Sequence, residues 1–333
     1  MQLRMLYLKQ EDVIKAGVLD FDAALKDIEE VFRMMAKGEV VMPPKVAMDL
    51  YFPDGSPKGH LVAMPAYIKS LGIAGIKWAA GFFKNPELYG LPHGMDIIVL
   101  SDPESGRPLA IMDGTLITAV RTGAVAGVGA KFLAPDGASV AALIGAGVVG
   151  RAAGLALCSA MRGLSEVKIY DLKEEKARRL VNELPVDARS VRSAEEAIRD
   201  SDIIITATTS HSQFVKLEWL KKDCLCIELG KNEFEDSVIL NSGVLVVDYW
   251  EQIKARSWVS LTRLWRDGLL NESRIKSIID VVEEGRVEGG GLRFFSPIGM
   301  ACEDLIVAFR IYRTAREKGL GIELSLWEEP YWA

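Results

Sequence analysis

Three glycines and one acid near the middle of the chain have the spacing of a dinucleotide-binding site. Gly145, Gly147 and Gly150 form G-x-G-x-x-G directly after the apolar run Val140–Ile144, and Asp171 closes the next apolar run. The first glycine of such a motif permits a sharp turn, the second lets the backbone approach a pyrophosphate, and the third lets the next helix pack closely. An acid about twenty residues further on binds the ribose hydroxyls. We therefore predict a nicotinamide or flavin dinucleotide, with hydride transfer as the chemistry.

The residues around this motif indicate how the cofactor is held and which cofactor is used. Val148 and Val149 lead into a predicted helix over Arg151–Met161, whose free N–H groups would point at the phosphates. Asp171 would repel the 2′-phosphate of NADP, so it favours NAD. Lys173 lies close enough to soften that preference, which leaves NADP possible.

Basic residues outside the motif are candidates for binding and activating an acid substrate. Lys77 lies within the apolar predicted strand Ala74–Ala79, where a charge is costly unless it meets an anion. Loss of solvent would lower the pKa of Lys77 and suit it to proton transfer near neutral pH. Arg121 could hold a carboxylate through two parallel hydrogen bonds, and Lys45 follows two prolines in uncharged surroundings. A surface charge or a structural ion pair is the alternative for each of them.

The composition limits the classes of partner. The 333 residues are 49% hydrophobic, which predicts large cores and about two domains. A net charge of −6 without a basic patch argues against nucleic acid. We expect no apolar stretch long enough to span a membrane and no signal peptide at Met1–Lys9. The cysteines and histidines lack metal-site spacing, so we predict core thiols, no metal and a cytoplasmic, reducing location. These residues are Cys158, Cys224, Cys226, Cys302, His60, His93 and His211.

Predicted strands and helices alternate from Val140 to Asp248, the pattern of a doubly wound parallel sheet. Thr206, Ala207 and Thr208 follow one of these strands, so they either line the cofactor crevice or form an ordinary polar loop. After the first strand–helix–strand unit we predict strands at Asp187–Val191, Ile203–Thr206, Cys224–Leu229 and Val244–Asp248, with helices at Glu174–Leu184 and Ala194–Asp200.

The N-terminal third reads as a mixed α+β region. It opens with an amphipathic helix over Asp22–Lys37 and continues with predicted strands. A small-residue helix over Leu116–Leu133 leads into the cofactor domain, and the helix Met300–Lys318 would pack back on the first domain. We therefore expect a substrate domain from 1–122 and 300–333 and a Rossmann domain from 123–299. The further predicted strands are Val46–Tyr51, Gly59–Met64, Ala74–Ala79 and Ile97–Leu100.

Together these motifs resemble the ornithine cyclodeaminase/mu-crystallin family over essentially the whole chain. The motifs are Met42-Pro-Pro-Lys45, Gly75-Ile-Lys-Trp78, Asp102–Pro108, Arg121-Thr-Gly-Ala124, Gly145–Gly150, Thr206–Ser210 and Ser296–Asp304. The resemblance implies a Rossmann domain plus a substrate domain that dimerises through its sheet. It also implies that Lys45, Lys77 and Arg121 surround the substrate carboxylate beside the nicotinamide, and that Lys77 transfers a proton. Ser296 and Gly299 belong to the segment that would close the site near the cofactor.

One segment departs from the cyclodeaminases that this chain resembles. Those enzymes carry an Asp just after the fifth Rossmann strand, in a glycine-rich segment, where it assists ring closure and release of ammonia. Here Cys224–Gly230 runs into Lys231–Asp236, which is shorter and has no Asp at the matching place, while Glu228 falls within the predicted strand. This difference shifts the prediction away from ornithine cyclodeamination.

We therefore predict an NAD(P)H-dependent imine reductase, or an amino-acid dehydrogenase in the reverse direction. C4 of the nicotinamide would give hydride to the imine carbon, Arg121 and Lys45 would hold the carboxylate, and Lys77 would move the proton. One alternative is a cyclodeaminase-type ammonia-lyase, in which ring closure follows the same hydride step and NAD⁺ is regenerated. Another is a dinucleotide-dependent protein that holds a ligand, as mu-crystallin-like members do.

Overall fold

The computed structural model describes residues 2–210, 212–230, 232–257, 259–287 and 290–332, so His211 and Lys231 of the sequence analysis lie outside it. The contacts divide the chain into two units. The first unit comprises Met1–Asp20, Lys37–Arg121 and Met300–Ala333, and the second comprises Phe21–Ala36 and Thr122–Gly299.

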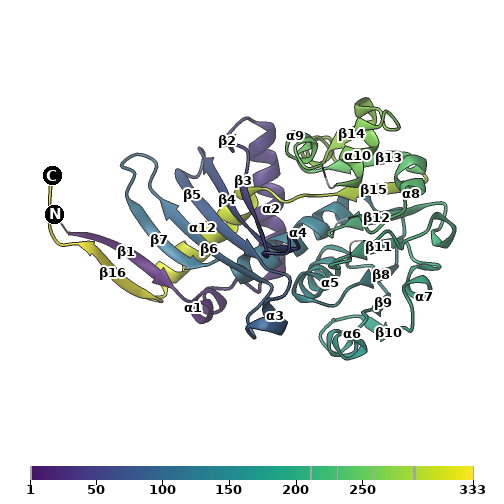
Figure 1. The fold of residues 1–333 in the computed structure, drawn as a ribbon, viewed down its shortest axis with the longest axis horizontal. Helices are drawn as coiled ribbons and strands as arrows, with labels where there is room; N and C mark the ends of the chain where they lie inside the picture. The colour runs from purple at the N-terminus through teal and green to yellow at the C-terminus, as the bar shows by residue number, and fades with distance from the viewer. Residues whose placement is uncertain (1, 211, 231, 258, 288–289, 333) are drawn as a thin grey trace. The chain divides into compact units, whose positions relative to one another are not determined.

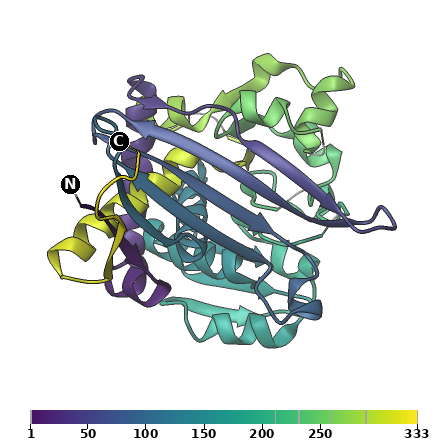
Figure 2. The same ribbon diagram turned by 60° about the vertical axis from the view of Figure 1, so that its left-hand side comes forward.

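The first unit is built on a mixed sheet of long strands. Its elements are β1 (Leu3–Leu8), α1 (Gln10–Lys15), β2 (Val40–Val41), β3 (Val46–Tyr51), β4 (Pro57–Ile68), β5 (Ile73–Gly81), α3 (Asn85–Leu88), β6 (Gly94–Ser101), β7 (Pro108–Asp113), α12 (Ala301–Glu317) and β16 (Ile322–Trp327). The strand order is β16-β1-β7-β6-β5-β4-β2, and β3 also pairs with β4. Figure 2 shows the long strands β4, β5 and β6 side by side.

Helix α12 gives the first sheet a covered face and an open face. It contacts β4, β5 and β6, as Figure 1 shows, and the side chains of Leu305, Ala308 and Ile311 are fully buried. Successive side chains of a strand point to opposite faces, so Lys77 and Trp78 in β5 face opposite ways. Lys77 is 1% exposed and Trp78 is 39% exposed, which places Lys77 on the covered face.

The second unit is the doubly wound parallel sheet that the alternating pattern predicts. Its elements are α2 (Phe21–Ala36), β8 (Val140–Ile144), α5 (Val148–Ala160), β9 (Glu166–Tyr170), α6 (Glu174–Val181), β10 (Asp187–Ser190), α7 (Ala194–Ile198), β11 (Ile203–Thr206), η1 (Leu217–Trp219), β12 (Cys224–Glu228), α8 (Asp236–Asn241), β13 (Val244–Val247), α9 (Trp250–Lys254), α10 (Ser260–Arg266), η2 (Glu272–Arg274), β14 (Ile275–Ser277), α11 (Ile278–Glu284) and β15 (Leu292–Ser296).

All neighbouring strands of the second sheet run parallel, in the order β10-β9-β8-β11-β12-β15-β13-β14. The order reverses between β8 and β11, and ligands of such sheets bind at the carboxyl ends of the strands beside that reversal. The apolar runs predicted as buried strands are buried as expected: Ala141, Ile203 and Leu225 have no exposed surface. We therefore expect the cofactor to bind at the carboxyl ends of β8, β11, β12 and β15.

Two expectations about helices differ from the structure. The helix expected over Asp22–Lys37 was assigned to the substrate domain, but α2 contacts α5 and α11 of the second unit. An amphipathic stripe shows that a helix has a buried face and does not identify the element that covers it.

The expectation of no membrane-length apolar stretch was also wrong. Helix α4 (Thr115–Leu133) is long and apolar enough to cross a membrane, but 72% of its apolar window is buried inside the molecule, which is typical of a core helix.

Candidate active site

The turn after β8 has the geometry that a pyrophosphate requires. Gly145 has φ of +97°, a conformation that favours glycine, and its N–H donates to the carbonyl oxygen of Tyr170 at 2.8 Å. A Cβ added at Gly150 would lie 1.8 Å from the carbonyl oxygen of Gly145, so only glycine lets α5 begin here. At Gly147 a Cβ would meet nothing within 4 Å, which leaves that side of the turn open to a ligand.

The first turn of α5 offers backbone donors at this open side. Gly147 is the N-cap residue, no side chain caps the helix, and the first turn contains no acid. Val148 is 66% exposed and Val149 is half-buried, so both lie beside the opening. Uncapped N–H groups and the positive end of the helix dipole suit a phosphate anion. These residues fit the dinucleotide that their spacing predicts.

Asp171 lies at the carboxyl end of β9 and is fixed against the same turn. Its Oδ2 accepts a hydrogen bond from the N–H of Ala146 at 2.7 Å, and its Oδ1 accepts one from the N–H of Lys173 at 2.8 Å. Lys173 therefore contacts the acid through its backbone. A carboxylate held in this position is suited to the ribose hydroxyls and repels a 2′-phosphate, which agrees with NAD.

The loop after β11 is held by an acid that the sequence did not single out. Glu233 is fully buried; its Oε2 accepts hydrogen bonds from the Thr206 hydroxyl at 2.5 Å and from the N–H of Gly230 at 3.1 Å. Its Oε1 accepts the N–H of Thr208 at 2.9 Å. The Thr206 side chain is thus engaged within the protein and has no exposed surface, so it positions the loop. Ala207 and Thr208 are half-buried at the rim of the turn.

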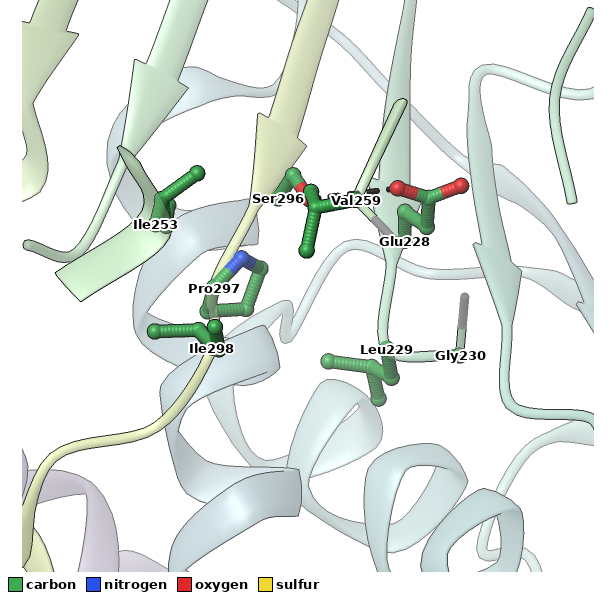
Figure 3. A pocket seen from close by; sticks show the side chains of 8 residues that line it. All are labelled: Glu228, Leu229, Gly230, Ile253, Val259, Ser296, Pro297 and Ile298. Carbon is green, nitrogen blue, oxygen red and sulfur yellow. Dashed lines mark hydrogen bonds between the residues drawn. The ribbon is translucent and has the colours of Figure 1, made fainter. Parts of the chain in front are cut away.

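A cavity of about 90 Å³ lies beside the carboxyl ends of β12 and β15. Figure 3 shows its lining: Glu228, Leu229, Gly230, Ile253, Val259, Ser296, Pro297 and Ile298. Its walls are mostly apolar, and Glu228 and Ser296 are the polar side chains among them. The segment that follows β15 is held in place because the N–H of Gly299, at φ of +79°, donates to Asp248 at 2.5 Å.

Glu228 is the buried acid of this cavity. Its Oε1 accepts the N–H of Glu233 at 3.0 Å, and its Oε2 accepts the hydroxyl of Ser296 at 3.2 Å. Burial, with the nearby charge of Glu233, raises the pKa of Glu228 to about 7. It is the last residue of β12, as its place before Gly230 predicts.

Two of the three predicted basic residues, Lys77 and Arg121, belong to a buried ion-pair network. Nζ of Lys77 lies 2.8 Å from Oδ2 of Asp304, and Nε of Arg121 lies 2.9 Å from Oδ1 of the same acid. Nη1 of Arg121 also lies 2.8 Å from Oε2 of Glu303. Lys77 belongs to β5, Arg121 to α4, and the two acids to the first turn of α12, where the helix dipole favours negative charge.

For Lys77 and Arg121 the structure shows the ion pairs that the sequence analysis gives as the alternative, so their surroundings are not uncharged. The anion that Lys77 requires is supplied by the protein itself. Burial lowers the pKa of Lys77 despite the attraction of Asp304. Burial alone would raise the pKa of Asp304, but Arg121 and Lys77 hold it below its usual value. The sequence signal for these partners is the pair of adjacent acids, Glu303 and Asp304, at the start of an apolar helix.

Lys45 directly precedes β3, in the sheet that contains Lys77. Strand β3 begins at Val46, which pairs with Ala63, while Met64 pairs with Lys77. Continuing this register by one residue sets Lys45 opposite Met64, in line with Lys77 two strands away. Lys45 is half-buried.

The arrangement has the chemistry for binding a carboxylate and moving a proton. The ion pairs of Arg121 use Nε and Nη1, and a guanidinium carries five N–H donors, so donors are left for a ligand. Within the described part of the chain, no group of three or more His, Cys, Asp and Glu side chains could hold a metal ion. The four cysteines are buried thiols.

Comparisons with known proteins show which family model, relatives and solved structures this chain is similar to. The model of the ornithine cyclodeaminase/mu-crystallin family matches residues 5–319. The chain is 34% identical over 334 residues to alanine dehydrogenase of Archaeoglobus fulgidus, covering 97% of this chain and 99% of that protein. It is similar to the structure of Thermococcus litoralis Δ1-pyrroline-2-carboxylate reductase in complex with NADH and L-proline, with a TM-score of 0.86, 28% identity and coverage of 96% and 99%. An archaeal alanine dehydrogenase dimer with bound NAD gives a TM-score of 0.85 at 32% identity, with coverage of 98% and 100%.

Proposed function

Because the chain belongs to the ornithine cyclodeaminase/mu-crystallin family, we infer that it is an NAD(P)-dependent oxidoreductase acting on C=N or CH–NH₂ groups. Its reaction is reduction of an imine at the α-carbon of an imino acid, or the reverse oxidation of an amino acid. The relatives named alanine dehydrogenase and Δ1-pyrroline-2-carboxylate reductase support this reaction class.

The observation that carries the proposal is the buried network of Lys77, Arg121 and Asp304. Lys77 is 1% exposed and burial lowers its pKa, so it gives up a proton more readily than an exposed lysine does. The arginine next to it is suited to a carboxylate. Burying one charge costs several kcal/mol, which is about the stability of a small domain. Such a set of buried charges is therefore unusual in a core that only stabilises the fold.

Each side chain has one role in the proposed reaction. The bound nicotinamide supplies hydride when reduced and accepts it when oxidised. Arg121 binds the carboxylate of the substrate and Lys45, which precedes β3 in the same sheet, adds positive charge. Lys77 donates a proton to the imine nitrogen during reduction and accepts one during oxidation. Asp304 keeps Lys77 and Arg121 in place.

The connection after β12 supports reduction in preference to cyclodeamination. In the short segment between Glu228 and α8, one of the two acids, Glu233, holds Thr206, Thr208 and Gly230. Glu228 is bonded within the protein to Glu233 and Ser296. Both carboxylates are thus engaged by hydrogen bonds within the protein, which favours a structural role for them over ring closure.

A homodimer is the proposed assembly, in the cytoplasm. The open face of the first sheet carries apolar side chains, among them Val46, Met48 and Ile97, which are 65%, 46% and 46% exposed. Val46 pairs with Ala63, Ala63 with Trp78, and Trp78 with Ile97, so these residues form a continuous cross-strand row. Apolar patches of this kind mark protein interfaces. A second copy of the chain is the proposed partner, and buried thiols are compatible with a reducing compartment.

The experiment is a spectrophotometric assay with the wild-type chain and a Lys77→Ala variant. We expect NADH oxidation with pyruvate plus ammonia or with Δ1-pyrroline-2-carboxylate, and NAD⁺ reduction with L-alanine or L-proline. Lys77→Ala should lower kcat by about 100-fold or more, with the Kd for NADH unchanged. Full activity of Lys77→Ala would refute the proton-transfer role. Absence of turnover by the wild-type chain with every substrate would refute the reductase and favour a ligand-binding protein.

A further inference from the structure

A hydrogen-bonded chain leads away from Lys77 toward a second acid. Nζ of Lys77 donates to Oγ1 of Thr118 at 3.2 Å, and that hydroxyl donates to Oδ2 of Asp96 at 2.5 Å. Lys77 lies in β5, Thr118 in α4 and Asp96 in β6, all within the first unit. The distances suit transfer of a proton along the chain.

The sheet register explains why Asp96 lies beside Lys77. Lys77 pairs with Ile98, and Asp96 is two residues before Ile98 on the same face of β6. The other carboxyl oxygen of Asp96 accepts the N–H of Ala80 at 3.2 Å, so the acid is fixed in orientation. Asp96 is 9% exposed and Lys77 is 1% exposed, so both ends of the hydrogen-bonded chain are buried and Asp96 is the more exposed of the two.

Burial and the neighbouring charges bring the pKa values of Lys77 and Asp96 closer to each other. Burial lowers the pKa of Lys77, and Arg121 adds to this effect against the attraction of Asp304 and Asp96. Burial raises the pKa of Asp96, and Asp304 adds to this effect against Lys77 and the Thr118 hydroxyl. Proton transfer becomes easier as the pKa values of donor and acceptor approach each other.

We propose that Thr118 and Asp96 form a proton relay that resets Lys77 between turnovers, an inference that rests on the proposed function. During oxidation Lys77 takes a proton from the substrate nitrogen and passes one N–H proton to Oγ1 of Thr118. The Thr118 hydroxyl proton moves to Oδ2 of Asp96, and Asp96 releases it to water. During reduction the imine nitrogen takes a proton from Lys77, and the same atoms return one from water. The relay moves protons only; the electron pair moves as hydride between cofactor and substrate.

The test compares Thr118→Val, Thr118→Ser and Asp96→Asn with the wild type. Valine removes the hydroxyl and asparagine cannot take the proton, so both should lower kcat by about 10- to 100-fold, with the Kd for NADH unchanged. Serine keeps the hydroxyl and should restore activity. Small buffer acids should raise kcat of the valine and asparagine variants in proportion to their concentration, without effect on the wild type. Thr115→Val is the matched control, because Thr115 contacts the Asp96 backbone and not Lys77.

The outcomes separate the relay from the proposed function. Loss of activity in Lys77→Ala together with full activity in Thr118→Val and Asp96→Asn would overturn the relay and leave the function standing. Full activity in Lys77→Ala would overturn both. Loss of activity in the valine and asparagine variants without rescue by buffer, or equal loss in Thr115→Val, would assign Thr118 and Asp96 a structural role and overturn the relay.

Discussion

At the scale of single residues, the site depends on buried charges that are matched inside the protein. Asp304 serves two cations at once, which explains why an acid with no exposed surface keeps a lowered pKa. Glu228 is the opposite case, because its neighbours are Glu233 and neutral donors, and its pKa rises to about 7. A group with a raised pKa in the folded state makes stability depend on pH.

Glu228 therefore predicts a loss of stability as pH rises. Its ordinary pKa is 4.5, and the folded value is about 7. The folded state holds a proton that the unfolded state has lost over this window, so the stabilisation present below pH 4.5 disappears as pH rises through 7. The full effect is up to ~3 kcal/mol. Urea denaturation at pH 5 and pH 8 should show that Glu228→Gln reduces this fall, while Glu104→Gln on the surface leaves it unchanged. Equal pH dependence in wild type and Glu228→Gln would contradict the raised pKa.

At the scale of elements, the turn between β8 and α5 contains one glycine needed for folding and another suited to cofactor binding. Gly150 is required by the contact with the backbone of Gly145, and Gly147 faces open space. Substitution at the two positions should therefore have different consequences.

Gly147→Ala should fold normally and bind NADH about 10-fold or more weakly, about 1.4 kcal/mol. Gly150→Ala should lose about 3 kcal/mol or more of unfolding free energy, because the clash is with backbone atoms. Calorimetric titration of NADH and urea denaturation measure the two quantities. Gly163→Ala is the control, since its Cβ would meet nothing within 4 Å. Normal NADH affinity in Gly147→Ala would exclude this turn as the pyrophosphate site.

The elements also show what the sequence could and could not predict. Strand β8, the glycines and Asp171 were predictable because their signal is local: spacing, apolar runs and turn chemistry. The partners of Arg121 were not, since Glu303 and Asp304 lie more than 180 residues away along the chain and no local pattern joins them. The same holds for Glu233, whose role depends on the packing of two neighbouring loops, and for α2, whose apolar stripe fits either unit.

At the scale of the whole molecule, the proposed dimer follows from the open face of the first sheet. One face is covered by α12, and the other carries the row of Val46, Trp78 and Ile97. Covering this exposed apolar face with a second copy of the chain would remove its side chains from water, which is favourable.

Charged substitutions on this face should produce monomers. Ile97→Glu combined with Met48→Glu places carboxylates where the proposed interface excludes water, which is costly. Light scattering after size-exclusion chromatography should give twice the chain mass for the wild type and one chain mass for the double variant. Leu172→Glu, at a residue 91% exposed in the second unit, should remain dimeric. A monomeric wild type, or a dimeric double variant, would rule out this interface.

The central claim is hydride transfer to or from the α-carbon of an amino acid. It is tested most directly by supplying NADH deuterated at both C4 positions, with pyruvate and ammonia or Δ1-pyrroline-2-carboxylate, and analysing the product by mass spectrometry and NMR. We predict one deuterium at the α-carbon of the amino acid for each NADH oxidised. Wild-type turnover that gives no deuterium at the α-carbon, or the absence of any NADH oxidation, would contradict it.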